Sequence, residues 1–144
     1  MRFWDSSALV PLLVAEKQTP ILQSLYLEDP VLLVWWGTEV ECVSALGRLE
    51  RSGGISPPAM EEALGRLRDL RSVWQEIQPG PRLREVACRL LRTHPLRSAD
   101  ATQLAAAIIA SLDRPSTLGF VCADERLVGA ARKEGFAVPG LSSL

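Results

Sequence analysis

The sequence has little histidine and little cysteine. Its 144 residues contain one histidine, His94, and three cysteines, which is an odd number without a closely spaced pair. These counts exclude a disulfide framework, a cysteine zinc site and a metal cage built from histidines, and they fit a reducing compartment. Catalysis of the Ser-His-Asp or Cys-His type would depend on His94 alone.

Long apolar runs and a strong net charge are also absent. No apolar run approaches the roughly 18 residues that a membrane-spanning helix needs. The chain begins with Asp5 ahead of its first apolar stretch and shows no small-residue cleavage pattern, which argues against a signal peptide. Its 16 basic and 17 acidic residues leave a net charge of -1, which argues against a protein that coats DNA but not against a local basic groove. We therefore expect a cytoplasmic protein without membrane association.

The composition is that of a globular protein, with 47% hydrophobic and 23% charged residues. The length suits one domain with a substantial core, and neither an internal repeat nor a long linker interrupts it. We therefore expect residues 1–144 to form a single domain.

Short, continuous apolar runs predict strands that are covered on both faces, as in a parallel sheet. These runs cover residues 1–5, 31–36, 74–77, 120–122 and 136–138. Helical periodicity between them predicts helices over residues 7–15, 20–28, 38–51, 57–72, 82–93, 98–112 and 125–134. The alternation predicts an α/β fold in which helices cover both faces of a mainly parallel five-stranded sheet.

Four acidic residues fall where such a sheet builds its binding sites. Asp5 follows the first predicted strand and Asp124 follows the fourth, so both belong at the carboxyl edge of the sheet. Asp100 lies in the first turn of one predicted helix, and Glu41 lies about one turn into another. Four carboxylates in one crevice repel one another unless they are protonated or neutralised by a cation. Oxygen ligands alone select a hard cation such as Mg²⁺ or Mn²⁺.

Each acid also has a purely structural explanation. Asp5 and Asp124 could cap the helices that follow them, and Asp100 could complement a helix dipole. Glu41 could be a solvated surface residue, and helical periodicity places Glu39 almost as well. Periodicity does not choose between the two glutamates.

The residues around these acids resemble the PIN-domain nucleases, specifically the VapC-type toxins of toxin–antitoxin pairs. The resemblance rests on the segments FWDSSALVPLLVAE, EVECVSALGRL, LRSADATQLAAAI and FVCADERLVGAA, which cover nearly the whole chain in the family's order. It implies a PIN-like three-layer α/β/α fold. It also implies that metal is bound by the catalytic acids Asp5, Glu41, Asp100 and Asp124.

The resemblance selects Glu41 rather than Glu39, because the family's glutamate is followed four and five residues later by Ala and Leu, here Ala45 and Leu46. It further implies an endoribonuclease that uses Mg²⁺ or Mn²⁺ to activate the water that cleaves an RNA phosphodiester bond. Such a protein is the toxin of a toxin–antitoxin pair, is held inactive by a cognate antitoxin and forms homodimers.

The chain departs from the family pattern at Cys122. PIN nucleases commonly have Ser or Thr two residues before the fourth acid, which is itself the most variable of the four, and a thiol is a poorer hydrogen-bond donor. Ser6 or Ser7 could supply a hydroxyl to substrate or could only cap the first helix. Arg97 and Arg126 lie beside the acids and are candidate phosphate contacts, whereas the arginines at 82, 84, 89 and 92 fit a solvated helix face.

Two other functions fit less of the sequence. A catalytically silent PIN-like module that binds RNA or protein is favoured by Cys122 and disfavoured by the intact acids. A phosphatase or a receiver-type aspartyl-phosphate protein fits Asp5 after the first strand. However, Ser7 stands where that class has a second Asp, and no lysine is well placed.

Overall fold

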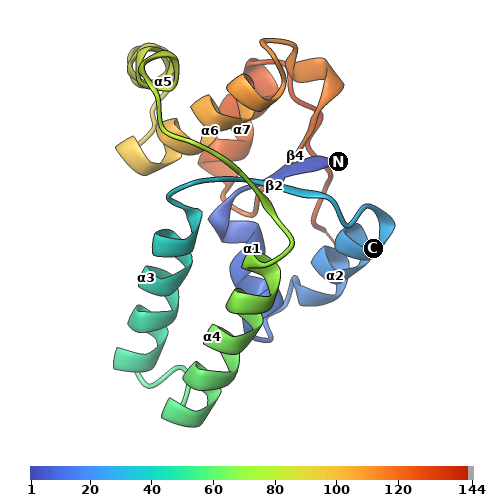
Figure 1. Cartoon of the computed structure of the whole chain (residues 1–144), viewed down its shortest axis with the longest axis vertical. Helices are drawn as coiled ribbons and strands as arrows, with labels where there is room; N and C mark the ends of the chain where they lie inside the picture. The colour runs from blue at the N-terminus through green and yellow to red at the C-terminus, as the bar shows by residue number, and fades with distance from the viewer. Residues whose placement is uncertain (143–144) are drawn as a thin grey trace.

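A computed structural model describes residues 1–142 and shows a parallel β-sheet between two layers of helices (Figure 1). The sheet consists of β1 (Arg2–Trp4), β2 (Leu32–Trp35), β3 (Gln75–Ile77) and β4 (Gly119–Val121). Its order is β3-β2-β1-β4, and each neighbouring pair is parallel. The α/β class and the parallel sheet predicted from the continuous apolar runs are confirmed.

All the predicted helices are present, and their ends lie within two residues of the predicted limits. They are α1 (Ser6–Leu13), α2 (Thr19–Glu28), α3 (Thr38–Arg51), α4 (Pro57–Arg71), α5 (Pro81–Thr93), α6 (Ser98–Ala110) and α7 (Glu125–Lys133), with a short 3₁₀ turn at Pro115–Thr117. Their boundaries have local causes. The Ser56 hydroxyl accepts a hydrogen bond from the Ala59 N–H at the start of α4, and Gly135, with a φ of 104°, follows the end of α7. No helix within residues 1–142 is both long and apolar enough to cross a membrane.

The prediction of a fifth strand over residues 136–138 is wrong. Ala137 makes only an isolated parallel bridge with Gly119, in which its carbonyl accepts a 2.9 Å hydrogen bond from the Phe120 N–H. Pro139 follows and has no N–H to extend a ladder. The apolar run is explained by burial of Phe136, whose ring centroid lies 5.5 Å from that of Phe120. The sheet therefore has four strands within the described residues.

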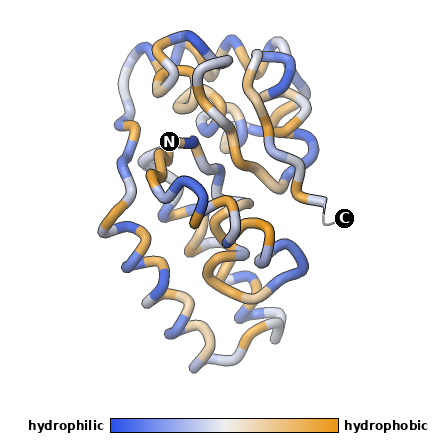
Figure 2. Tube along the Cα trace, turned by 90° about the vertical axis from the view of Figure 1, so that its right-hand side faces the viewer, coloured by the Kyte–Doolittle hydropathy of each residue, from blue (hydrophilic) through white to orange (hydrophobic). Residues whose placement is uncertain are grey.

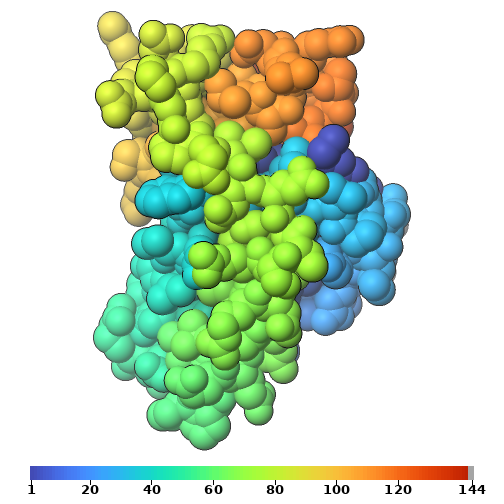
Figure 3. Space-filling view, viewed as in Figure 1, coloured from blue at the N-terminus to red at the C-terminus, as the bar shows by residue number. Residues whose placement is uncertain are grey.

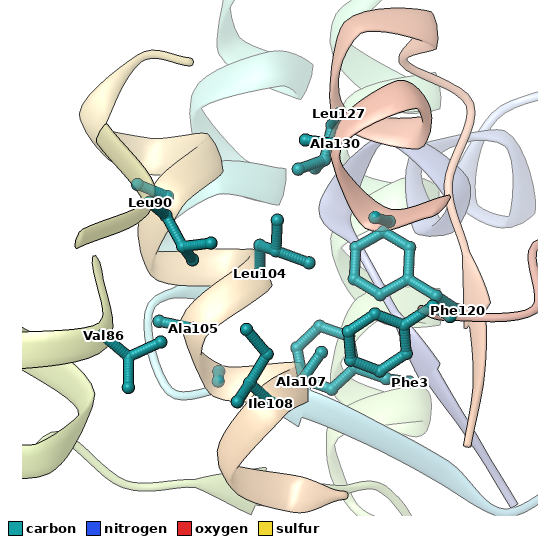
Figure 4. Close-up of a cluster of buried hydrophobic side chains, with 14 of the residues drawn as sticks. Phe3, Val86, Leu90, Leu104, Ala105, Ala107, Ile108, Phe120, Leu127 and Ala130 are labelled. Carbon is teal, nitrogen blue, oxygen red and sulfur yellow. The ribbon is translucent and has the colours of Figure 1, made fainter. Parts of the chain in front are cut away.

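Side chains of adjacent strand residues point to opposite faces and divide the core into two parts. Phe3 and Phe120 stack with ring centroids 5.6 Å apart on the face covered by α5, α6 and α7. Figure 4 shows Leu104 of α6 beside these rings and Leu90 of α5 beyond it. Trp4 lies on the other face, in the core formed with α1, α3 and α4. Since Phe3 and Trp4 are both fully buried, both faces of the sheet are covered, as in a three-layer fold.

The neighbouring helices α3 and α4 extend away from the sheet as a hairpin (Figures 1 and 3). Apolar and polar residues alternate along these helices (Figure 2), and their apolar residues Cys42, Leu46, Ala63 and Leu67 are buried. An ion pair of 3.0 Å between Arg71 and Glu39 joins α4 to the first turn of α3. This packing holds the beginning of α3 at the sheet, and with it Glu41.

Candidate active site

The four predicted acids line one cleft of about 440 Å³ at the carboxyl edge of the sheet. Asp5 directly follows β1 and is the N-cap of α1, and Asp124 is the N-cap of α7. Glu41 and Asp100 lie in the first turns of α3 and α6. Four helices therefore begin at this cleft, and the partial positive charge of their N-termini offsets part of its negative charge.

Asp5 is the most deeply buried of these acids, with 4% of its surface exposed. Its Oδ2 accepts hydrogen bonds from the Ser7 N–H, at 3.0 Å, and from the Ser7 hydroxyl. The Cys122 Sγ lies 3.6 Å from the same oxygen. Burial raises the pKa of Asp5, these hydrogen bonds lower it, and the charge of Asp100 raises it further. Asp5 thus caps α1 and is at the same time an acid that resists ionisation inside the cleft.

Glu41 is held at both carboxylate oxygens. Its Oε1 accepts a 3.0 Å hydrogen bond from the Ser6 hydroxyl, and its Oε2 accepts one of 3.1 Å from the Gln103 Nε2. Burial, followed by the charges of Asp5 and Asp100, raises the pKa of Glu41 to about 7. Glu39 points elsewhere and pairs with Arg71. The structure therefore brings Glu41, and not Glu39, to the other acids.

Asp100 and Asp124 stabilise the starts of their own helices. The Asp100 Oδ2 accepts a 3.2 Å hydrogen bond from the Arg97 N–H. The Asp124 Oδ1 accepts hydrogen bonds from the N–H groups of Arg126 and Leu127, at 2.9 and 3.1 Å. The structural explanations for both residues are thus correct, and they do not prevent either side chain from lining the cleft.

Ser7 supplies the hydroxyl beside Asp5 that Cys122 lacks. Its Oγ accepts a 2.9 Å hydrogen bond from the Ala123 N–H and donates to Asp5, so it joins the loop after β4 to the loop after β1. The Cys122 Sγ lies 3.5 Å from this oxygen. Burial raises the pKa of the Cys122 thiol, so the thiol stays protonated and adds no negative charge. The hydroxyls of Ser6 and Ser7 position acids, and the substrate contact expected of them stays a prediction.

Arginines border the cleft on two sides. Arg97 and Arg126 line an adjoining hollow together with Asp100 and Asp124. Arg48 reaches the cleft from α3, where its guanidinium donates a 3.3 Å hydrogen bond to the Ser44 hydroxyl. Within residues 1–142 none of these three arginines forms an ion pair. The sequence did not point to Arg48, because an arginine in the last turn of a helix is the ordinary complement of the helix dipole.

The chemistry of the donor set fits Mg²⁺ or Mn²⁺, because the cleft offers carboxylate oxygens and no imidazole. In the part of the chain that the structure describes, however, no group of three His, Cys, Asp or Glu side chains is arranged so that it could hold a metal ion. The hydrogen bonds that cap the helices at Asp5, Asp100 and Asp124 each use a single carboxylate oxygen. The other oxygen of each carboxylate accepts no hydrogen bond within residues 1–142 and is available to a cation.

Comparison with known proteins gives a likeness of fold. No family model and no curated protein matches the chain in sequence. A toxin–antitoxin complex from Klebsiella pneumoniae matches with a TM-score of 0.68 and 16% identity over 100% of both chains. FitAcB from Neisseria gonorrhoeae matches with a TM-score of 0.64 and 16% identity over 98% of both chains.

The chain shares its fold with a protein of the Klebsiella toxin–antitoxin complex and with one of FitAcB. PAE2754 from Pyrobaculum aerophilum also matches, with a TM-score of 0.68 and 22% identity over 95% of this chain and 81% of that one. Because all three identities are low, the likeness concerns the fold, and activity must be argued from the residues of the cleft.

Proposed function

We propose that this protein is a metal-dependent endoribonuclease of the PIN-domain, VapC type and acts as the toxin of a toxin–antitoxin pair. The observation that supports this best is the meeting of Asp5, Glu41 and Asp100 at one cleft. These residues are far apart in sequence, yet the charge of Asp100 raises the pKa of both other acids. A site that gathers carboxylates at this electrostatic cost suits a cation and a phosphodiester.

Asp5, Glu41, Asp100 and Asp124 would hold the Mg²⁺ or Mn²⁺ ion. The bound ion would lower the pKa of a water molecule and stabilise charge on the attacked phosphate. The chain itself orients the acids. Ser6 and Gln103 fix the two oxygens of Glu41, and Ser7 fixes one oxygen of Asp5.

The RNA backbone would be held by the arginines around the cleft. Guanidinium groups bind phosphate through paired N–H donors, and those of Arg48, Arg97 and Arg126 form no ion pair within residues 1–142. They lie on both sides of the acids. A strand that contacts them would pass over the acids with a phosphodiester bond inside the cleft.

The proposed partner is a cognate antitoxin, with the protein as a cytoplasmic homodimer. Two neighbours in fold are a toxin–antitoxin complex and FitAcB. The acidic cleft suits a basic side chain from an inhibitor. A largely apolar hollow lined by Leu12, Tyr26, Arg66 and Leu70, among others, lies between α1, α2 and α4. This hollow would bind the apolar face of an amphipathic helix from the antitoxin.

A second candidate is a silent PIN-like module that binds RNA or protein without cleavage. It is favoured by the orientation of Asp100 and Asp124 toward their own helix starts. The two candidates differ in whether the acids bind metal and whether RNA is cut.

The test is cleavage of a structured RNA by the purified protein with Mn²⁺ or with EDTA. We expect cleavage with Mn²⁺ and its loss in EDTA, in Asp5→Asn and in Glu41→Gln. Glu39→Gln is the matched control, because it removes a carboxylate two residues away that pairs with Arg71 outside the cleft. Equal cleavage in EDTA, or by Asp5→Asn, would exclude the proposed mechanism.

A further inference from the structure

Gln103 is a fully buried amide in a helix whose other buried residues are apolar. It lies about one turn after Asp100 on α6. The buried residues before and after it in this helix, beginning with Ala101 and Leu104, are apolar. A polar side chain in such a place needs hydrogen-bond partners, because burial without them is costly.

The amide nitrogen of Gln103 bonds to two residues of α3. The Nε2 donates to the Glu41 Oε2 at 3.1 Å and to the Thr38 Oγ1 at 3.0 Å. An ionised Glu41 carboxylate offers only acceptors. It therefore favours the orientation in which the Gln103 Nε2, and not the Oε1, faces Glu41.

The other end of the same amide has no partner. The Gln103 Oε1 is buried and accepts no hydrogen bond within residues 1–142. A buried acceptor without a donor destabilises a protein. Methionine would fill similar space without this cost. Packing alone therefore does not explain a glutamine at this position, whereas its bonds to Thr38 and Glu41 do.

We propose that Gln103 is a positioning residue for the metal site. Its amide ties the Glu41 carboxylate to α6, the helix that also carries Asp100, and thus fixes the relation between two acids that come from different helices. Ser6 holds the other oxygen of Glu41, so removal of Gln103 leaves that carboxylate held at one oxygen only. This inference rests on the proposed function, because it assumes that Glu41 binds a cation.

The experiment is calorimetric titration of Mn²⁺ into the full chain, together with the EPR spectrum of the bound ion, for wild type and Gln103→Met. We expect Gln103→Met to weaken Mn²⁺ binding by about 10-fold or more and to change the spectrum, while the variant remains folded. The matched control is Thr102→Val on the same helix, whose lost hydroxyl bonds only to the Ala99 carbonyl. Its Mn²⁺ affinity should equal that of wild type.

A double-mutant cycle then shows whether Gln103 acts through Glu41. Gln103→Met should cause no further loss of Mn²⁺ affinity in a Glu41→Gln background. If Glu41→Gln weakens binding and Gln103→Met does not, the positioning role is wrong and the proposed function stands. If Glu41→Gln leaves the affinity unchanged, Glu41 is not a ligand and the proposed function itself fails.

Gln103→Leu replaces Gln103→Met if the methionine variant does not fold. If neither variant folds, the positioning role is tested in the wild-type protein through the NMR resonances of the Gln103 side-chain amide. Titration with Mg²⁺ should shift them with the same midpoint as the metal-binding isotherm. Resonances that do not move while Mg²⁺ binds would overturn the positioning role.

Discussion

Replacement of Glu41 by glutamine should stabilise the metal-free protein at alkaline pH and not at acid pH. Burial and the charges of Asp5 and Asp100 raise the pKa of Glu41 from 4.5 to about 7. At a pH between these two pKa values, Glu41 has lost its proton in the unfolded chain but still holds it in the folded chain. The free energy of unfolding therefore falls as pH rises through this range.

The size of the effect follows from that pKa. A rise from 4.5 to about 7 corresponds to about 3 kcal/mol at about 1.4 kcal/mol for each tenfold change in proton affinity. Because Glu41 is partly exposed, solvent screening reduces this figure, and we expect Glu41→Gln to add about 1–3 kcal/mol at pH 8. Glutamine preserves the contacts, because its oxygen accepts from Gln103 and its NH₂ group donates to the Ser6 hydroxyl.

The assay is urea denaturation in EDTA at pH 4 and pH 8, with Glu39→Gln as the matched control. We expect Glu41→Gln and wild type to be about equally stable at pH 4 and to differ at pH 8. Addition of Mg²⁺ at pH 8 should narrow or reverse the difference, because a ligand that binds only the folded state stabilises it. An equal effect of Glu41→Gln at both pH values would refute the reasoning.

Three further predictions concern the rest of the molecule. Cys88 is exposed while the other two cysteines are buried, so Ellman's reagent should modify one thiol rapidly in native protein, and rapid modification of all three would contradict the fold. Arg48→Ala should weaken RNA binding and reduce the slope of log affinity against log salt by about 1, whereas exposed Arg92→Ala should do neither in the same filter-binding assay. Glu134 accepts hydrogen bonds from Arg89, at 2.8 Å, and His94, which lower its pKa. Glu134→Gln should therefore destabilise the protein by about 1 kcal/mol at pH 7, and by less as the pH falls through the lowered pKa of Glu134. Equal stability of this variant and wild type in urea at pH 7 would contradict the prediction.

The strands and helices were predictable where a local pattern was enough. Continuous apolar runs marked β1, β2 and β4, and periodicity with proline and glycine at the ends marked the helices. The run at 136–138 misled because its apolar residues resemble a buried strand, although Phe136 is buried without a strand around it. Local patterns report burial, and only pairing with a neighbour makes a strand.

The gathering of the four acids in one cleft was predictable from the sequence, but the residues that hold these acids were not. The resemblance to PIN nucleases distinguished Glu41 from Glu39, which periodicity did not, and the structure places only Glu41 in the cleft. Gln103 was missed, although an amide within an apolar helix pattern is a usable signal of a buried polar contact. Its partner, 62 residues away, becomes visible only in three dimensions.

The central claim is that acids from separate helices hold one hard cation, and it is tested most directly by Mn²⁺ titration into wild type and Asp100→Asn at neutral pH. We expect wild type to bind Mn²⁺ with a dissociation constant in the millimolar range or below, and we expect Asp100→Asn to lose this binding. Absence of Mn²⁺ binding by the folded wild-type protein, or unchanged binding by Asp100→Asn, would contradict it.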